Sequence, residues 1–166
     1  MKKQSTLSKS ILIVLASTLL LFTIATSLQI LDQKYHREHL EELTSTEVIN
    51  GSTYYNYADT PYTTLAGIFS IIYFLLAPLV VLIVSGRFLS REKEKTAYLQ
   101  SLLIPLSFLG LTLVLQAFVV YYSEGSFRTD LAVIQLGIMF LYALVVFLLV
   151  SLINGLIIYL KKKRRS

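Results

Sequence analysis

The sequence predicts an all-α, polytopic integral membrane protein with four transmembrane helices and both termini in the cytoplasm. Two observations predict the class: 55% of the 166 residues are hydrophobic, and four long stretches contain no Asp, Glu, Lys, Arg or His. Each stretch can cross about 30 Å of hydrocarbon at about 1.5 Å per helical residue. A third observation, the alternating charge of the segments between them, predicts the orientation. The stretches cover residues 11–31, 64–86, 98–122 and 131–160.

The first stretch has a basic start and an apolar run, which is also the layout of a secretory signal peptide. Its run exceeds the roughly 7–15 residues of a signal-peptide core. After Ile30 the chain continues Leu31-Asp32-Gln33, without a small-residue cleavage pattern, and Ala-Thr-Ser at 25–27 is a poor one. We therefore expect a retained helix, with a cleaved signal as the alternative.

Residues 32–63 form the largest exterior segment. Its first part has strong helix formers and no Gly or Pro, so the first helix should continue past the membrane surface. Asn50-Gly51-Ser52 predicts a turn. Four tyrosines follow, and they indicate either an interfacial belt or an exterior surface for a partner. These are Tyr54, Tyr55, Tyr57 and Tyr62.

The same segment contains the only two histidines, in the pattern His36-x-x-His39-x-x-Glu42. A shared helix face with three such groups is one way to hold zinc, but the spacing is not H-E-x-x-H. A solvated helix face is the favoured interpretation. We assign no catalytic, metal-binding or cofactor-binding residue and expect no cofactor.

The later spans each carry one local feature. Pro78 lies near the middle of the second span and Pro105 lies one to two turns inside the third. Proline removes a helical hydrogen bond, so a kink at Pro78 is expected. Thr129 or Asp130 is a candidate cap for the fourth helix. That stretch is longer than a bilayer needs, so it should tilt or emerge among the headgroups.

The charges are divided by side. Segments before the first span, between the second and third, and after the fourth hold 12 of the 15 basic residues, whereas the other side holds eight of the ten acids. Lys and Arg of short loops remain in the cytoplasm. We therefore expect a protein of the cell membrane with both termini in the cytoplasm. The basic segments should attract anionic lipid headgroups. This distribution argues against nucleic-acid binding.

The interior chemistry is neutral. With no cysteine, the chain forms no disulfide and no thiolate site. The spans hold no ionisable Asp, Glu, Lys, Arg or His, which argues against proton-coupled transport, ion pumping and voltage sensing. Gln116, Gln135 and Asn154 are candidates for interhelical hydrogen bonds. Ser151 and Gly155 form a small-xxx-small pair that indicates close helix packing.

The connection Arg87–Tyr98, with the sequence RFLSREKEKTAY, is short and mixed in charge. We expect a helical extension or a tight amphipathic helix. It is either a solvated connection that sets the topology or a docking surface for a cytoplasmic partner. The candidate contacts are Arg87, Arg91, Glu92, Glu94, Lys95 and Thr96.

Within this connection, the segment REKEKTAYLQSLLIP (residues 91–105) resembles part of bacterial ABC-2-type exporter permeases. In that family an E-K-G-T stretch after the second span touches the ATPase subunit. The resemblance implies that Glu92, Glu94, Lys95 and Thr96 contact an ATPase. Two departures stand: Lys95 runs directly into Thr96 without the family glycine, and the family has six spans.

Residues 1–166 are thus expected to form one four-helix transmembrane domain. The first hypothesis for its function is a non-enzymatic subunit or accessory of a larger bacterial assembly, most plausibly transporter-linked. The second is a stand-alone protective protein of the bacteriocin-immunity type that acts through residues 32–62. The third is a membrane-embedded lipid-modifying enzyme. Homo-oligomerisation stays open, because an inverted-repeat transporter would require a second copy.

Overall fold

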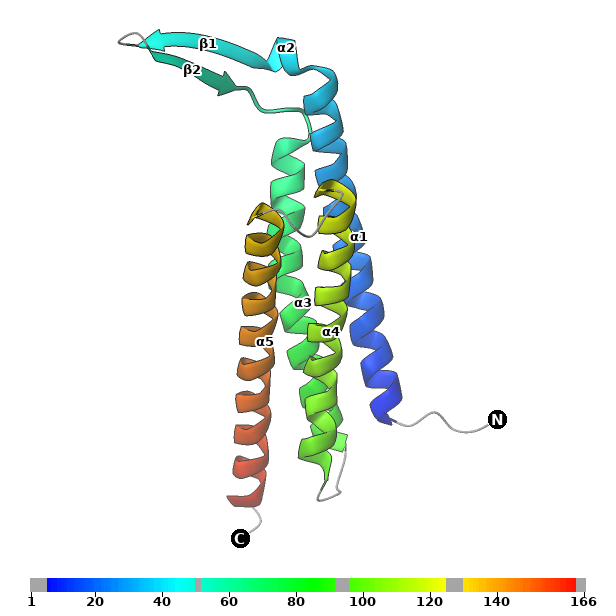
Figure 1. Ribbon diagram of the computed structural model, residues 1–166. Helices are drawn as coiled ribbons and strands as arrows, with labels where there is room; N and C mark the ends of the chain where they lie inside the picture. Colours follow the sequence, from blue (N-terminus) through cyan, green and yellow to red (C-terminus); the bar gives the residue numbers. More distant parts are fainter. Residues whose placement is uncertain (1–5, 50–51, 92–95, 125–129, 164–166) are drawn as a thin grey trace. The chain divides into compact units, whose positions relative to one another are not determined.

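The computed structural model describes residues 6–49, 52–91, 96–124 and 130–163 (Figure 1). Four long helices dominate it, with a short helix and a two-stranded hairpin between the first and second. The elements are α1 (Thr6–Glu38), α2 (Leu40–Leu43), β1 (Thr44–Ile49), β2 (Ser52–Tyr57), α3 (Thr63–Arg91), α4 (Ala97–Glu124) and α5 (Asp130–Lys163).

The four long helices confirm the predicted all-α membrane class. Each is long and apolar enough to cross a membrane by length and composition. Each is also longer than its predicted apolar stretch, because the polar residues at its ends continue the helix. For example, α1 runs to Glu38, beyond the predicted end at Leu31. Pro78 and Pro105 both lie inside continuous helices.

Large apolar side chains point outward along these helices. Leu75, Phe118 and Leu152 are 67%, 69% and 70% exposed. In water such a surface would be costly, whereas in hydrocarbon it is the expected outer face of a spanning helix. The exposure therefore agrees with a lipid-embedded chain.

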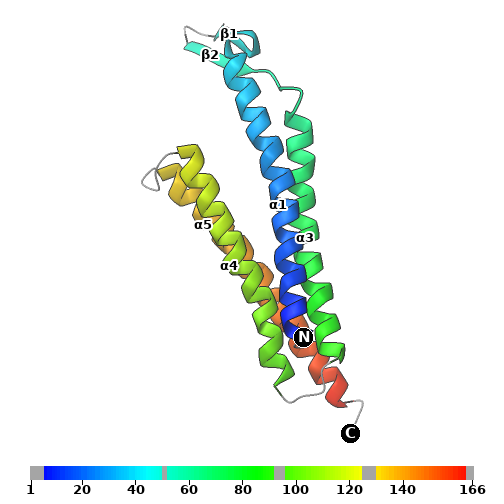
Figure 2. The same cartoon turned by 90° about the vertical axis from the view of Figure 1, so that its right-hand side faces the viewer.

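The chain divides into two compact units, which are described separately. The first comprises Met1–Thr18 and Ala77–Ser166, and the second comprises Leu19–Leu76. In the first unit α4 and α5 run side by side (Figures 1 and 2). Phe108 of α4 is fully buried and meets Tyr142 of α5 edge to face, with ring centroids 6.4 Å apart. Aromatic pairs of this geometry add to the packing of the two helices.

In the second unit the C-terminal half of α1 packs against the start of α3. Phe22 and Tyr73 are both buried and meet edge to face at 5.7 Å. Closer to the helix ends, Gln29 Nε2 donates to Ser70 Oγ at 3.0 Å. Apolar contacts and a neutral side-chain bond thus hold this helix pair together.

The hairpin was not predicted. β1 and β2 pair antiparallel, with Thr44 opposite Tyr57 and Ile49 opposite Ser52. The predicted turn residues Asn50 and Gly51 lie outside the described residues. The sequence did contain the indication: two runs rich in Thr, Val, Ile and Tyr flank Asn-Gly, which is the strongest short hairpin pattern. The tyrosines were interpreted by their preference for the membrane interface, and the strand propensity of both runs was not considered.

Candidate functional site

Three side chains in the first unit form a buried polar group, here named the Asn154 cluster: Ser85 of α3, Ser101 of α4 and Asn154 of α5. All three are fully buried. Asn154 Nδ2 donates to Ser85 Oγ at 2.5 Å and to Ser101 Oγ at 3.3 Å. Ser101 in turn donates to the carbonyl oxygen of Tyr98 at 2.7 Å. One amide therefore joins three helices.

The amide of Asn154 is only partly satisfied. An asparagine offers two N–H donors and a carbonyl oxygen that accepts. Both donors are used, whereas Oδ1 is buried and has no hydrogen-bond partner among the described residues. Leaving a buried acceptor unpaired costs about 1–3 kcal/mol. The cluster consequently retains one strong, unused acceptor in its interior.

A second polar link joins α3 and α5 near their C-terminal ends. Lys161 Nζ donates to the carbonyl oxygen of Leu89 at 2.6 Å. Leu89 lies in the last turn of α3, where carbonyls lack partners within the helix. Lys161 follows Asn154 by seven residues, about two helical turns, so both lie on the same face of α5. Two links therefore fasten the end of α3 to α5.

Close packing accompanies these links. A Cβ atom built on Gly155 would lie 3.9 Å from Tyr98 Cε2 and from Tyr98 Oη. Tyr98 of α4 thus lies over the glycine of α5. Ser151, the other half of the predicted small-residue pair, donates to its own helix at Phe147 O (2.6 Å). Gly155 is therefore the member of the pair that faces α4, and a Cβ there would make an ordinary contact with Tyr98.

The other predicted interhelical residues differ from Asn154. Gln116 is buried within α4. Gln135 is exposed near the start of α5, so it does not serve as an interhelical bond in the described part of the chain. Thr112, one turn before Gln116, has a buried hydroxyl with no hydrogen-bond partner among the described residues. Position along the sequence did not distinguish these polar residues, because helix rotation decides which of them faces a neighbour.

The candidate partner-contact residues lie at and after the end of α3. Arg87 and Arg91 are exposed and one turn apart, and Thr96 is exposed just before α4. Glu92, Glu94 and Lys95 lie outside the described residues. The helical extension expected of this connection is present as far as Arg91.

The second unit contains a different polar group, here named the Asp32 cluster: Asp32, Thr60 and Thr63. Asp32 Oδ1 accepts hydrogen bonds from Thr63 Oγ1 at 2.8 Å and from Thr60 Oγ1. Thr60 Oγ1 also accepts from the Tyr62 N–H at 3.0 Å, and Thr63 Oγ1 accepts from the Thr60 N–H at 2.9 Å. Pro61, between them, needs no donor partner at this position.

This arrangement is a reciprocal cap of α3 with a carboxylate added from α1. The two threonines satisfy backbone donors at the helix start, as in a capping box. A negative charge there also suits the positive end of the helix dipole. The sequence Asp59-Thr60-Pro61 before a helix indicated the cap, but nothing local indicated that Asp32, 28 residues earlier, completes it.

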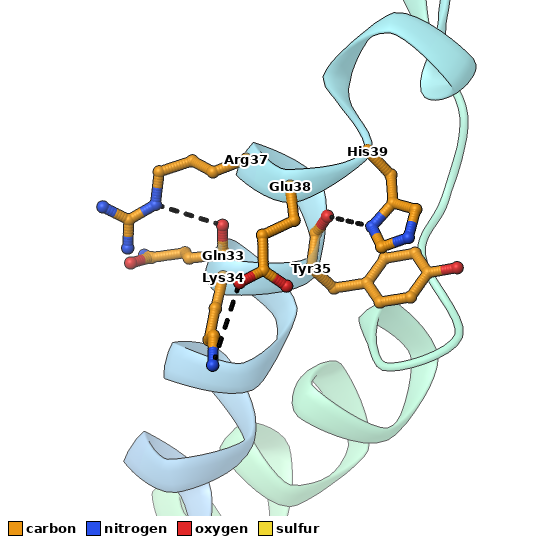
Figure 3. A network of polar contacts seen from close by, with 6 residues as sticks. All are labelled: Gln33, Lys34, Tyr35, Arg37, Glu38 and His39. Atoms are coloured by element: carbon orange, nitrogen blue, oxygen red, sulfur yellow. Dashed lines mark hydrogen bonds and ion pairs between the residues drawn. The ribbon is translucent and has the colours of Figure 1, made fainter.

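The histidine pattern begins in the last turn of α1, and Figure 3 shows His39 at the end of this helix. α1 stops at Glu38, and His39 has a non-helical backbone before α2 begins. His39 Nδ1 lies 3.1 Å from the Tyr35 carbonyl oxygen. The His39 and Tyr35 rings stack with their centroids 4.1 Å apart. The break at His39 means that His36, His39 and Glu42 do not share one continuous helix face. No group of three metal-binding side chains occurs within the described residues.

The surrounding charges at this helix end are partly paired. Lys34 Nζ and Glu38 Oε1 form an exposed ion pair at 3.8 Å, and Arg37 Nε donates to the Gln33 carbonyl oxygen at 3.3 Å (Figure 3). Exposed pairs of this kind contribute little stability.

The chain matches no protein-family model, and no curated protein or solved structure is significantly similar to it. The resemblance of residues 91–105 to ABC-2-type permeases therefore remains a prediction from the sequence.

Proposed function

We propose that the protein is a non-enzymatic integral membrane subunit or accessory of a larger bacterial assembly, namely a transporter. The single observation that carries this proposal is the fastened end of α3. Asn154 and Lys161 tie this end to α5, while Arg87 and Arg91 remain exposed on it. A rigid helix end that presents two arginines one turn apart is suited to a protein partner.

Two physical arguments support a docking role. Binding costs less entropy when the surface is already fixed in its bound geometry. Arginine is enriched at protein interfaces because its planar group makes several directed bonds to carboxylates. The partner would be a soluble protein with an acidic recess, and the resemblance of residues 91–105 makes an ATPase subunit the leading candidate.

The proposed location is the cell membrane, with both termini in the cytoplasm. Support comes from the charge distribution, since 12 of 15 basic residues belong to the two tails and the α3–α4 connection. In the described residues Lys9, Arg87 and Arg91 are exposed. Anionic headgroups would surround these residues, at about 1 kcal/mol each.

Purification from native cells in mild detergent tests the docking proposal. We expect a protein with ATPase activity to co-purify in stoichiometric amount with the unmodified chain. Arg91→Glu should reduce this recovery at least tenfold. Lys9→Glu is the matched control, because it makes the same charge reversal on an exposed residue of the same predicted side. A chain that purifies alone, or equal loss in both variants, would contradict the proposal.

A second candidate function is a stand-alone protective protein of the bacteriocin-immunity type. The observation that favours it is the hairpin, whose side chains at Ser45, Thr46, Thr53, Tyr54 and Asn56 are exposed. Expression of this chain alone in a sensitive host should then confer resistance to an antimicrobial peptide. Deletion of residues 44–57 should remove the resistance while the chain still reaches the membrane.

A further inference from the structure

The β1–β2 hairpin exposes side chains on both of its faces. Residues on one strand alternate between faces, so Thr46 and Thr53 belong to one face, and Ser45, Tyr54 and Asn56 to the other. All five side chains are exposed. Thr44, beside α2, is half-buried, so the uncovered part of the sheet begins at Ser45.

A two-stranded ribbon of this kind is marginally stable on its own in water. Independent stability requires a third strand or a covering element. The chain thus maintains a β-structure that lacks the cover it needs, at the end of a unit otherwise made of helices. A bound partner would supply that cover.

The backbone pattern defines which groups are available. The Ala58 N–H donates to the Leu43 carbonyl oxygen at 2.8 Å, so Leu43 and Ala58 are a hydrogen-bonded pair. Hydrogen-bonded and non-bonded pairs alternate along an antiparallel ladder. Thr44 has the same phase but caps the end of α2, so the N–H and C=O groups that point away from β2, to the outer edge of β1, are those of Thr46 and Val48. Such an edge is a template for another strand.

The charge near this edge indicates which kind of strand can bind there. Residues 32–63 hold six acids and two bases, a formal net charge of −4 with histidine neutral. Glu41 and Glu42 are exposed in α2, immediately before β1, and Asp59 is exposed just after β2. Lys34 is already paired with Glu38. A second copy would bring two segments of the same negative charge together, whereas a basic strand is attracted.

We propose that the outer edge of β1 binds an extended, basic peptide by strand addition, with Glu41 and Glu42 contacting its cations. Backbone bonds at Thr46 and Val48 provide the pairing, and the acids select for positive charge. This inference does not depend on the proposed partner contacts of Arg87 and Arg91 at the end of α3. It names a ligand class for the second candidate function, and binding is measured apart from protection in cells.

Binding is tested with the full chain in nanodiscs of zwitterionic lipid and a fluorescent decapeptide of alternating Lys and Val. Anisotropy should show saturable binding that weakens with salt. Thr46→Pro should weaken it at least tenfold, because proline removes an outward N–H while the ladder to β2 keeps its bonds. Thr46→Val keeps that N–H and should bind within twofold of the unmodified chain. The double variant Glu41→Gln/Glu42→Gln should bind severalfold more weakly and with less salt dependence.

Three results would overturn the proposal. The first is equal binding of an alternating Glu and Val decapeptide, or of the basic peptide to empty nanodiscs. The second is unchanged affinity in Thr46→Pro. The third is self-association, measured by sedimentation, that Thr46→Pro abolishes, since that result assigns the edge to a second copy. Loss of cell protection with binding intact would instead count against the second candidate function alone.

Discussion

The Asn154 cluster and the Asp32 cluster solve the same problem with different chemistry. Each joins helices through side-chain hydrogen bonds to hydroxyls. The Asn154 cluster is fully buried and uses a neutral amide, whereas the Asp32 cluster uses a carboxylate that is only half-buried. An ionised group in a buried site costs far more than a neutral one unless it is paired. The degree of burial therefore determines which polar group can serve as the link.

A second difference lies in completeness. Asp32 accepts two hydroxyl bonds at a helix start, where backbone donors and the helix dipole also favour its charge. The Asn154 amide leaves its Oδ1 without a partner among the described residues. The buried link is thus incompletely satisfied and the peripheral one is well satisfied. Two substitutions test this comparison and two more test the hairpin and the α4–α5 contact, in decreasing order of expected effect.

The largest effect is expected from placing a carboxyl in the neutral cluster. Asn154→Asp should lower the free energy of unfolding by about 3–5 kcal/mol when ionised, because the site supplies no described cation. A protonated carboxyl costs less to bury than an ionised one, so the loss should be small at low pH and grow as pH rises. Thermal unfolding in one detergent at pH 5 and pH 8 measures this. Asn56→Asp, on an exposed residue, is the control; equal effects would refute the neutral-site argument.

The next effect concerns the charged cluster. Asp32→Ala should destabilise the chain by about 1.5–3 kcal/mol, since two hydroxyls lose a charged acceptor. Asp59→Ala removes a neighbouring exposed carboxylate and should change stability by less than about 0.5 kcal/mol. Thermal unfolding of both variants measures the difference. Indistinguishable values would show that the cap does not need the α1 carboxylate.

A smaller effect is expected in the hairpin and sharpens the contrast between helical and strand regions. Ser45 belongs to a hydrogen-bonded pair with Asn56, so Ser45→Pro should remove a ladder bond. One such bond is worth about 1 kcal/mol, or about fivefold in local opening. Amide hydrogen exchange of β2 measures the change. Thr46→Pro should leave this exchange nearly unchanged. Faster exchange in Thr46→Pro than in Ser45→Pro would disprove the assignment of which β1 residues bond to β2.

The smallest effect is expected at the α4–α5 contact. Gly155→Ala places a methyl group in ordinary contact with Tyr98 and removes a glycine from a helix. We expect a gain of up to about 1 kcal/mol from helix propensity. Gly155→Leu should instead destabilise, because the larger side chain meets the tyrosine ring. Thermal unfolding of the two variants tests whether Gly155 sets the distance between α4 and α5.

The sequence allowed some of these features to be predicted. The limits of the four apolar stretches agree with α1, α3, α4 and α5 to within a few turns, and α1 continues beyond its apolar stretch as expected. Asn154 was identified as an interhelical residue. Its partners Ser85 and Ser101 were not linked to it, because they lie 69 and 53 residues away along the chain.

Other features required the folded chain. The phase of the β1–β2 ladder, the break at His39 and the exposure of Gln135 depend on how each element is rotated and paired. The Asn-Gly pair with strand-forming neighbours was sufficient to predict a hairpin, but not which edge groups would be available. Lys161 was expected to reach the lipid surface, and its bond to Leu89 becomes visible only when α3 and α5 are placed together.

The sequence by itself determined the class of this protein, because the transfer of side chains from water to hydrocarbon is nearly additive along a stretch of residues. It also determined how charge is divided between the segments that connect the spans. Only the tertiary structure decided which polar groups bond to one another and which strand edge is left open. Those outcomes depend on distance and orientation between residues far apart in the chain, and neither composition nor local pattern contains that information.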